Sequence, residues 1–146
     1  MDPRFLDFID EAGERRILEA IGRAERHSSG EIRVHLHKGG GEDVYQRAVE
    51  TFNRLEMYKT RLRNGILIYV DTRGRRFAVI GDEGIHRKVG SGFWEKIRDI
   101  LAEHFRRGQY TEGIVRAIDV IGLALAEHFP YSDDDINELP DEISFD

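Results

Sequence analysis

The run Gly65-Ile66-Leu67-Ile68-Tyr69-Val70 decides the fold, because it is apolar at every position after the glycine. A strand of this composition is typical of the middle of a sheet, where both faces are covered. The polar stretch Asp71-Thr72-Arg73-Gly74 follows it and predicts a turn, and Phe77-Ala78-Val79-Ile80 then predicts the returning strand of a hairpin. These two strands form the antiparallel part of the predicted sheet.

A second strand is predicted upstream, over Glu31-Ile32-Arg33-Val34-His35-Leu36-His37, where apolar and polar residues alternate strictly. This alternation is typical of a half-buried strand, and we expect it at or near an edge of the sheet. Between it and the buried run, Asp43 is placed to cap a helix whose apolar positions follow the helical period. A strand–helix–strand unit of this kind crosses right-handed and makes its two strands parallel.

Helical periodicity also predicts three flanking helices, over residues 7–27, 93–105 and 111–128. The predicted order is therefore α-β-α-β-β-α-α, and the fold class is α/β: a compact sandwich with a small mixed sheet and helices on both faces. We expect one domain over residues 5–130, followed by an acidic tail over residues 131–146. Two behaviours of the tail stay open: it is mobile, or it lies along the body on its apolar residues Ile136, Leu139, Ile143 and Phe145.

The composition excludes several classes of protein. The chain of 146 residues has 22 basic and 28 acidic side chains and no cysteine, which excludes disulfides, thiolate metal sites and a thiol nucleophile. No apolar run approaches the roughly 20 residues of a membrane helix, and the acidic N-terminus lacks the features of a signal peptide. We therefore expect a cytoplasmic protein with no direct membrane insertion.

The distribution of charge bears on the partner. All basic residues lie at or before Arg116 and form no basic stripe, so we expect no nucleic-acid partner. The acids after Pro130 instead suggest a tail that engages a protein partner; they are Asp133, Asp134, Asp135, Glu138, Asp141, Glu142 and Asp146.

The stretch Gly81-Asp82-Glu83-Gly84-Ile85-His86 places two adjacent carboxylates between glycines. Because the second hairpin strand returns antiparallel, we expect these acids at the end of the sheet where the upstream strand begins at Glu31 and where Asn64 precedes the buried run. Their oxygens are the ligands that Ca²⁺ or Mg²⁺ prefers, so four residues form a candidate metal site: Asp82, Glu83, Glu31 and Asn64. The alternative, which we favour, is a polar turn whose acids lie near a helix start.

Two other patterns are weaker. His35 and His37 share one face of their strand, and imidazoles two residues apart can chelate zinc or nickel. No third ligand stands at an obvious spacing, so we favour a solvated strand face. The loop Gly39-Gly40-Gly41 precedes a helix but lacks both phosphate-loop patterns. The loop acids are therefore the main candidate site.

Four blocks of sequence together resemble the TPM-domain family: Ser29-Gly30-Glu31-Ile32-Arg33-Val34, Asn64-Gly65-Ile66-Leu67-Ile68, Gly81-Asp82-Glu83-Gly84-Ile85, and Phe105-x-x-Gly108-x-Tyr110-x-x-Gly113-Ile114. The resemblance spans residues 5–130 and looks closest to the short soluble bacterial branch, whose members also end in an acidic stretch. It implies a compact α/β sandwich with a sheet of four strands or fewer. Some members have been described as calcium-binding, some plant-type members as acid phosphatases, and others as scaffolding or repair factors.

The chain departs from the acidic motif of such members, which reads G-x-G-[LI]-E with an Asp a few residues later. Asp82 stands at the first Gly, His86 stands at the Glu, and Gly90-Ser91 stand where the later Asp falls. The ligands that the resemblance implies are therefore altered, and Asp82 and Glu83 are the residues that would replace them.

Two functions follow as hypotheses. The preferred one is a non-catalytic binding or scaffold module that engages a protein partner and holds a divalent cation, Ca²⁺ or Mg²⁺. The alternative is a metal-assisted phosphatase, in which Asp82, Glu83 and Glu31 hold the ion and Arg63 or Arg87 contacts the phosphate anion. No general acid stands out in the sequence, and we therefore prefer the module.

Overall fold

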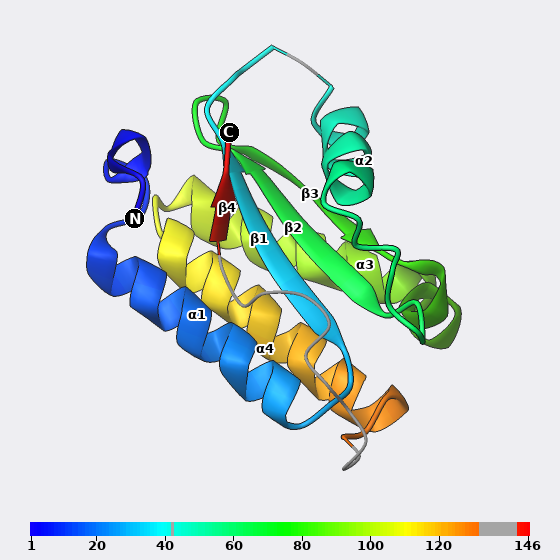
Figure 1. The fold of residues 1–146 in the computed structure, drawn as a ribbon. Coiled ribbons are helices and arrows are strands. Elements are labelled where there is room, and N and C mark those ends of the chain that lie inside the picture. The colour runs from blue at the N-terminus through cyan, green and yellow to red at the C-terminus, as the bar shows by residue number, and fades with distance from the viewer. Residues whose placement is uncertain (42, 132–142) are drawn as a thin grey trace.

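The computed structural model describes residues 1–41, 43–131 and 143–146 (Figure 1). Three of its helices begin at aspartates whose side chains accept a backbone N–H of the first turn, namely Asp10, Asp43 and Asp82. The elements, in chain order, are a 3-10 turn Pro3–Phe5, α1 Glu11–Arg26, β1 Glu31–His37, α2 Val44–Arg54, β2 Gly65–Asp71, β3 Arg76–Gly81, α3 Glu83–Arg106, α4 Tyr110–His128 and β4 Ile143–Phe145.

The four strands form one mixed sheet in the order β3-β2-β1-β4. β1 and β2 are parallel, with Glu31 opposite Gly65, and β2 and β3 are antiparallel, with Ile66 opposite Gly81. Every residue of β2 is buried. The predicted α/β class, the parallel unit, the hairpin and the central position of β2 are therefore confirmed.

The prediction that β1 is half-buried is wrong, whereas its predicted place at or near an edge of the sheet agrees with the strand order, in which β1 lies next to the edge strand β4. β4 pairs in parallel with residues Val34 to Leu36 of β1 on the side away from β2 (Figure 1), and six of the seven β1 residues are buried. The end of the predicted acidic tail supplies this strand, because Ile143 and Phe145 pack against the main core. The two other predicted apolar anchors, Ile136 and Leu139, lie outside the described residues.

Helix α3 begins at Glu83 rather than at the predicted Phe93. The two segments of α3 meet at Gly90, whose φ of 77° and ψ of 176° interrupt the helical conformation. Glycine tolerates a positive φ at little cost, and the helix resumes beyond it. The predicted loop from Gly81 to Gly84 is therefore the end of β3, a helix cap and the first turn of α3.

Helices cover the two faces of the sheet unequally. α1, α3 and α4 lie on one face and enclose the larger core, in which Ile32, Val34, Ile66 and Ile68 are fully or almost fully buried. α2 covers the other face over a smaller core, comprising Ala48, Phe52, Met57, Leu67, Tyr69 and Ala78. Across residues 1–41, 43–131 and 143–146, we find no helix that is both long and apolar enough to cross a membrane.

Candidate functional site

The candidate metal residues lie at one end of the sheet. The backbone N–H of Asp82 donates to the carbonyl of Gly65 at 2.9 Å, and the N–H of Glu31 donates to the carbonyl of Asn64 at 3.4 Å. Glu31, Gly65 and Asp82 therefore form one row across three strands. We call this end of the sheet, with Glu31, Arg63, Asn64, Asp82, Glu83 and Arg87, the acidic corner.

Asp82 is held by a fork of hydrogen bonds. Arg63 donates from Nε to Oδ2 at 2.7 Å and from Nη2 to Oδ1 at 2.9 Å, while the N–H of Glu83 donates to Oδ1 at 2.8 Å. Asp82 is only 7% exposed. The hydrogen bonds with Asp82 also raise the pKa of Arg63 above its ordinary value. Both carboxylate oxygens thus serve an ion pair and a helix cap, roles typical of a structural carboxylate.

The backbone of Arg63 completes the start of α3. Its carbonyl accepts the N–H groups of Gly84 at 2.8 Å and Ile85 at 3.3 Å, which a helix start otherwise leaves without partners. A Cβ on Gly84 would lie 2.1 Å from the carbonyl oxygen of Leu62. Glycine is required there by this close approach. The favoured sequence interpretation, acids near a helix start, agrees with this geometry.

The other residues of the acidic corner differ in exposure. Glu31 and Asn64 are 2% and 1% exposed, whereas the side chain of Glu83 is 53% exposed. Glu83 lies 3.5 Å from Arg63 and 3.8 Å from Arg87, so these arginines belong to a chain of ion pairs. In the described part of the chain, no cluster of three His, Cys, Asp or Glu side chains has the arrangement of a metal site.

The side chain of Asn64 has unused hydrogen-bonding capacity. Its Nδ2 donates to Oγ of Ser29 at 3.3 Å, but its buried Oδ1 accepts no hydrogen bond from any described residue. A buried acceptor in this state calls for a physical explanation. A cation ligated by this oxygen is one such explanation.

A second polar cluster lies at the opposite end of β1. Asp146 Oδ1 lies 2.6 Å from Nδ1 of His37 and 3.0 Å from Nε2 of His35, and Arg54 of α2 donates to Oδ2 at 2.9 Å. His35 is 1% exposed, and its Nδ1 lies 2.7 Å from Oγ of Ser144. The predicted solvated strand face is therefore wrong, because β4 and α2 cover these histidines. We call this group the Asp146 cluster.

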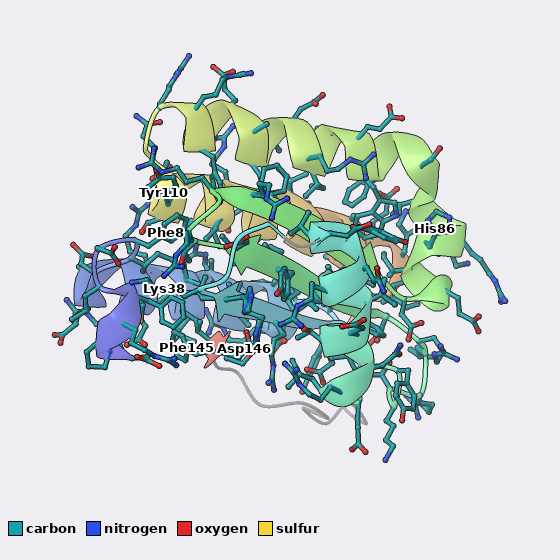
Figure 2. All side chains as sticks on the ribbon, turned by 90° about the horizontal axis from the view of Figure 1, so that it is seen from above. Phe8, Lys38, His86, Tyr110, Phe145 and Asp146 are labelled. Atoms are coloured by element: carbon teal, nitrogen blue, oxygen red, sulfur yellow. The ribbon has the colours of Figure 1, made fainter. Side chains whose placement is uncertain are left out.

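The electrostatics of the Asp146 cluster favour a neutral His35 beside an ionised carboxylate. Burial lowers the pKa of His35 below its ordinary value. Burial also opposes ionisation of Asp146, but its contacts with His35, His37 and Arg54 outweigh that effect and lower its pKa to about 2. Figure 2 shows Asp146 next to Phe145, whose ring centroid lies 5.2 Å from that of Phe5. The cluster thus fastens the last strand to the sheet.

Sequence reasoning missed Asp146 as a partner of the histidines. The signal was present in the alternation Ile143-Ser144-Phe145-Asp146, which is the pattern of a short strand with two apolar and two polar positions. Composition concealed it, because these residues follow a run of acids that reads as a solvated tail.

The comparisons with known proteins agree with the fold. The family model of the TPM domain matches residues 4–124. No curated protein matches the chain. An NMR structure of the BA42 protein from the psychrophilic bacterium Bizionia argentinensis is 42% identical, covers 95% of this chain and 96% of its own, and has a TM-score of 0.88.

A solution NMR structure of the N-terminal domain of a protein from P. gingivalis shares the fold at 22% identity, with a TM-score of 0.67 over 86% of this chain and 83% of its own. The order of elements, the extent of the family match and the similarity to BA42 lead to one conclusion. The chain belongs to the TPM domain family.

Proposed function

We propose that this chain is a non-catalytic binding module that engages a protein partner in the cytoplasm. The observation that supports the proposal is the fork of hydrogen bonds from Arg63 to Asp82. A metal-assisted phosphatase needs carboxylate oxygens that face a cation and a basic side chain that faces the phosphate. At the acidic corner, the basic side chain of Arg63 and the carboxylate of Asp82 instead bond to each other.

The same fork bears on Ca²⁺ and Mg²⁺. A cation at the acidic corner would take oxygens from Asp82, Glu83, Glu31 and Asn64. It would compete with Arg63 for the Asp82 oxygens, because both bind the same carboxylate. We therefore propose that cation binding is weak in the native protein and becomes stronger when Arg63 is replaced by a neutral side chain.

The alternative function is supported by one observation. The buried Oδ1 of Asn64, which accepts no hydrogen bond from the described residues, is a suitable cation ligand. If a cation bound there strongly enough to displace Arg63, that arginine and Arg87 would become available to a phosphate group. This is the arrangement that a metal-assisted phosphatase requires.

Two measurements separate these functions. Calorimetric titration with CaCl₂ and MgCl₂ compares the native chain with Arg63→Gln, Asp82→Asn and the control Asp43→Asn, which changes the cap of α2 instead. Hydrolysis of p-nitrophenyl phosphate is followed in the same samples. We expect weak cation binding that strengthens in Arg63→Gln, and no turnover above buffer. Turnover that requires Mg²⁺ or Ca²⁺ and is lost in Asp82→Asn but kept in Asp43→Asn would establish the phosphatase.

A further inference from the structure

Within residues 1–41, 43–131 and 143–146, strand β3 has an open edge, because β2 is its neighbour on one side and it ends the sheet on the other. The N–H of Asp82 points toward β2 and bonds to Gly65. In an antiparallel pair, successive residues point their backbone groups alternately toward and away from the partner strand. The N–H and C=O groups of Val79 and Gly81 therefore point outward, and no described residue bonds to them from that side.

A slot of about 310 Å³ lies along this edge. Val79, Ile80 and Gly81 supply its strand side, α2 contributes Tyr45, and α3 contributes His86, Ser91, Trp94 and Arg98. The indole of Trp94 packs on Gly81 so closely that a Cβ there would lie 2.3 Å from the ring. The slot thus brings outward-facing peptide groups next to an aromatic surface.

The interruption of α3 at Gly90 shapes one wall of the slot. His86 lies before the interruption and Trp94 after it, and the Trp94 indole N–H donates to Nδ1 of His86 at 3.0 Å. Since Nδ1 accepts, the neutral imidazole carries its proton on Nε2 and can donate from there. Figure 2 shows His86 in the first turns of α3, well away from Asp146. This wall is therefore separate from the Asp146 cluster.

The charge of the slot is positive. Arg98 is exposed and forms no ion pair with any described residue, and the residues that line the slot include no carboxylate. The neighbouring acids of α3, Glu95 and Asp99, line a different groove together with His104. A guanidinium that lines this slot and forms no ion pair with the described residues favours a carboxylate from a partner.

We propose that this slot binds an extended acidic peptide segment of a protein partner, which adds a strand to β3. The backbone of the segment pairs with Val79 and Gly81, one apolar side chain packs on Trp94, and an Asp or Glu side chain pairs with Arg98. Strand addition supplies affinity through the main chain, and the slot supplies selectivity through the side chains. The inference rests on the proposed function, because it names the partner of a binding module.

The experiment selects peptides from a display library of random eight-residue sequences on the full chain. We expect the enriched peptides to carry an acidic residue beside an apolar one. Their affinity should fall at least about tenfold in Arg98→Glu and stay unchanged in Arg116→Glu, which alters an exposed arginine of α4. The thermal unfolding temperature of both variants checks that they remain folded.

Amide hydrogen exchange then locates the bound peptide. Bound peptide should slow exchange at Val79 and Gly81 more than at the other β3 amides. The absence of enriched peptides, equal affinity in the two variants, or protection at a different surface would each overturn the proposal. Phosphatase assays distinguish failure of the peptide slot from failure of the proposed non-catalytic function. If no peptide binds and no phosphate ester is hydrolysed, only the slot is rejected. If peptides bind as expected and phosphate ester is hydrolysed, only the non-catalytic function is rejected.

Discussion

The substitution Asp146→Asn tests how firmly the last strand is fastened. Asparagine keeps the size of the side chain but removes the charge that His35, His37 and Arg54 surround. A pKa lowered from 3.8 to about 2 corresponds to about 2.4 kcal/mol of stabilisation of the folded state. The side chain is 29% exposed, so solvent screening reduces this figure, and we expect the variant to lose about 1–2 kcal/mol at neutral pH.

The pH dependence of this loss gives a sharper test than its size. Asp146 binds a proton less readily in the folded chain than in the unfolded one, so it stabilises the fold above pH 3.8. That contribution falls as the pH falls from 3.8 through about 2, where the folded chain also takes up the proton. The difference between the native protein and Asp146→Asn should therefore be full at pH 7 and shrink below pH 3.8.

Urea unfolding followed by circular dichroism measures both quantities. The two proteins are compared at several pH values between neutral and acid, with the exposed Asp99→Asn as the control for loss of a negative charge. We expect Asp99→Asn to change stability by less than about 0.5 kcal/mol. Equal stability of Asp146→Asn and the native protein at pH 7, or a difference that does not shrink in acid, would refute the reasoning.

Three further outcomes are expected. Deletion of residues 143–146 should lower the free energy of unfolding by more than Asp146→Asn does, because it also removes the apolar contacts of Ile143 and Phe145. A urea unfolding curve that matches that of the native protein would contradict this expectation. Gly84→Ala should lower the free energy of unfolding by about 1–3 kcal/mol, because its Cβ would clash with the Leu62 carbonyl. The control Gly92→Ala, whose Cβ meets no atom within 4 Å, should stabilise α3 by about 0.5–1 kcal/mol. Thermal unfolding that ranks the two variants in the opposite order would be inconsistent with the packing. Burial lowers the pKa of His35, so the unfolded chain binds a proton at this imidazole more readily than the folded chain does, and the native protein loses stability as the pH falls below 6.5. In His35→Asn this loss should be smaller. An unchanged dependence of stability on pH would show that His35 does not titrate on unfolding.

The sequence predicts the parts of the fold that local patterns specify. The apolar run from Gly65 to Val70 predicts the central strand, and the cap at Asp43 predicts the start of α2. The neighbours of β1 depend on a segment more than 100 residues later in the chain, since Val34 pairs with Ile143. Alternation along β1 reports that its two faces differ, but not whether another strand covers its edge.

The acidic corner shows the same division. Antiparallel return of β3 predicts that Asp82 and Glu31 lie at one end of the sheet, and the register agrees. The engagement of Asp82 by Arg63 could not be predicted, because Arg63 reaches it through a backbone with a φ of 53°, a conformation that arginine rarely adopts. The order of the strands in the sequence thus predicts which residues lie at one end of the sheet. The backbone conformation of the loops determines which of those residues form ion pairs with one another.

The unequal cover of the two faces of the sheet has a consequence for motion. α2 closes its face over the smaller core, and the Gly39-Gly40-Gly41 loop leads into it from β1. Native proteins open in cooperative units, and a unit with few buried apolar contacts opens at a lower free energy than the global transition. We therefore expect α2 to open at a lower free energy than α1, α3 and α4, and each opening would expose Tyr69, which belongs to the smaller core.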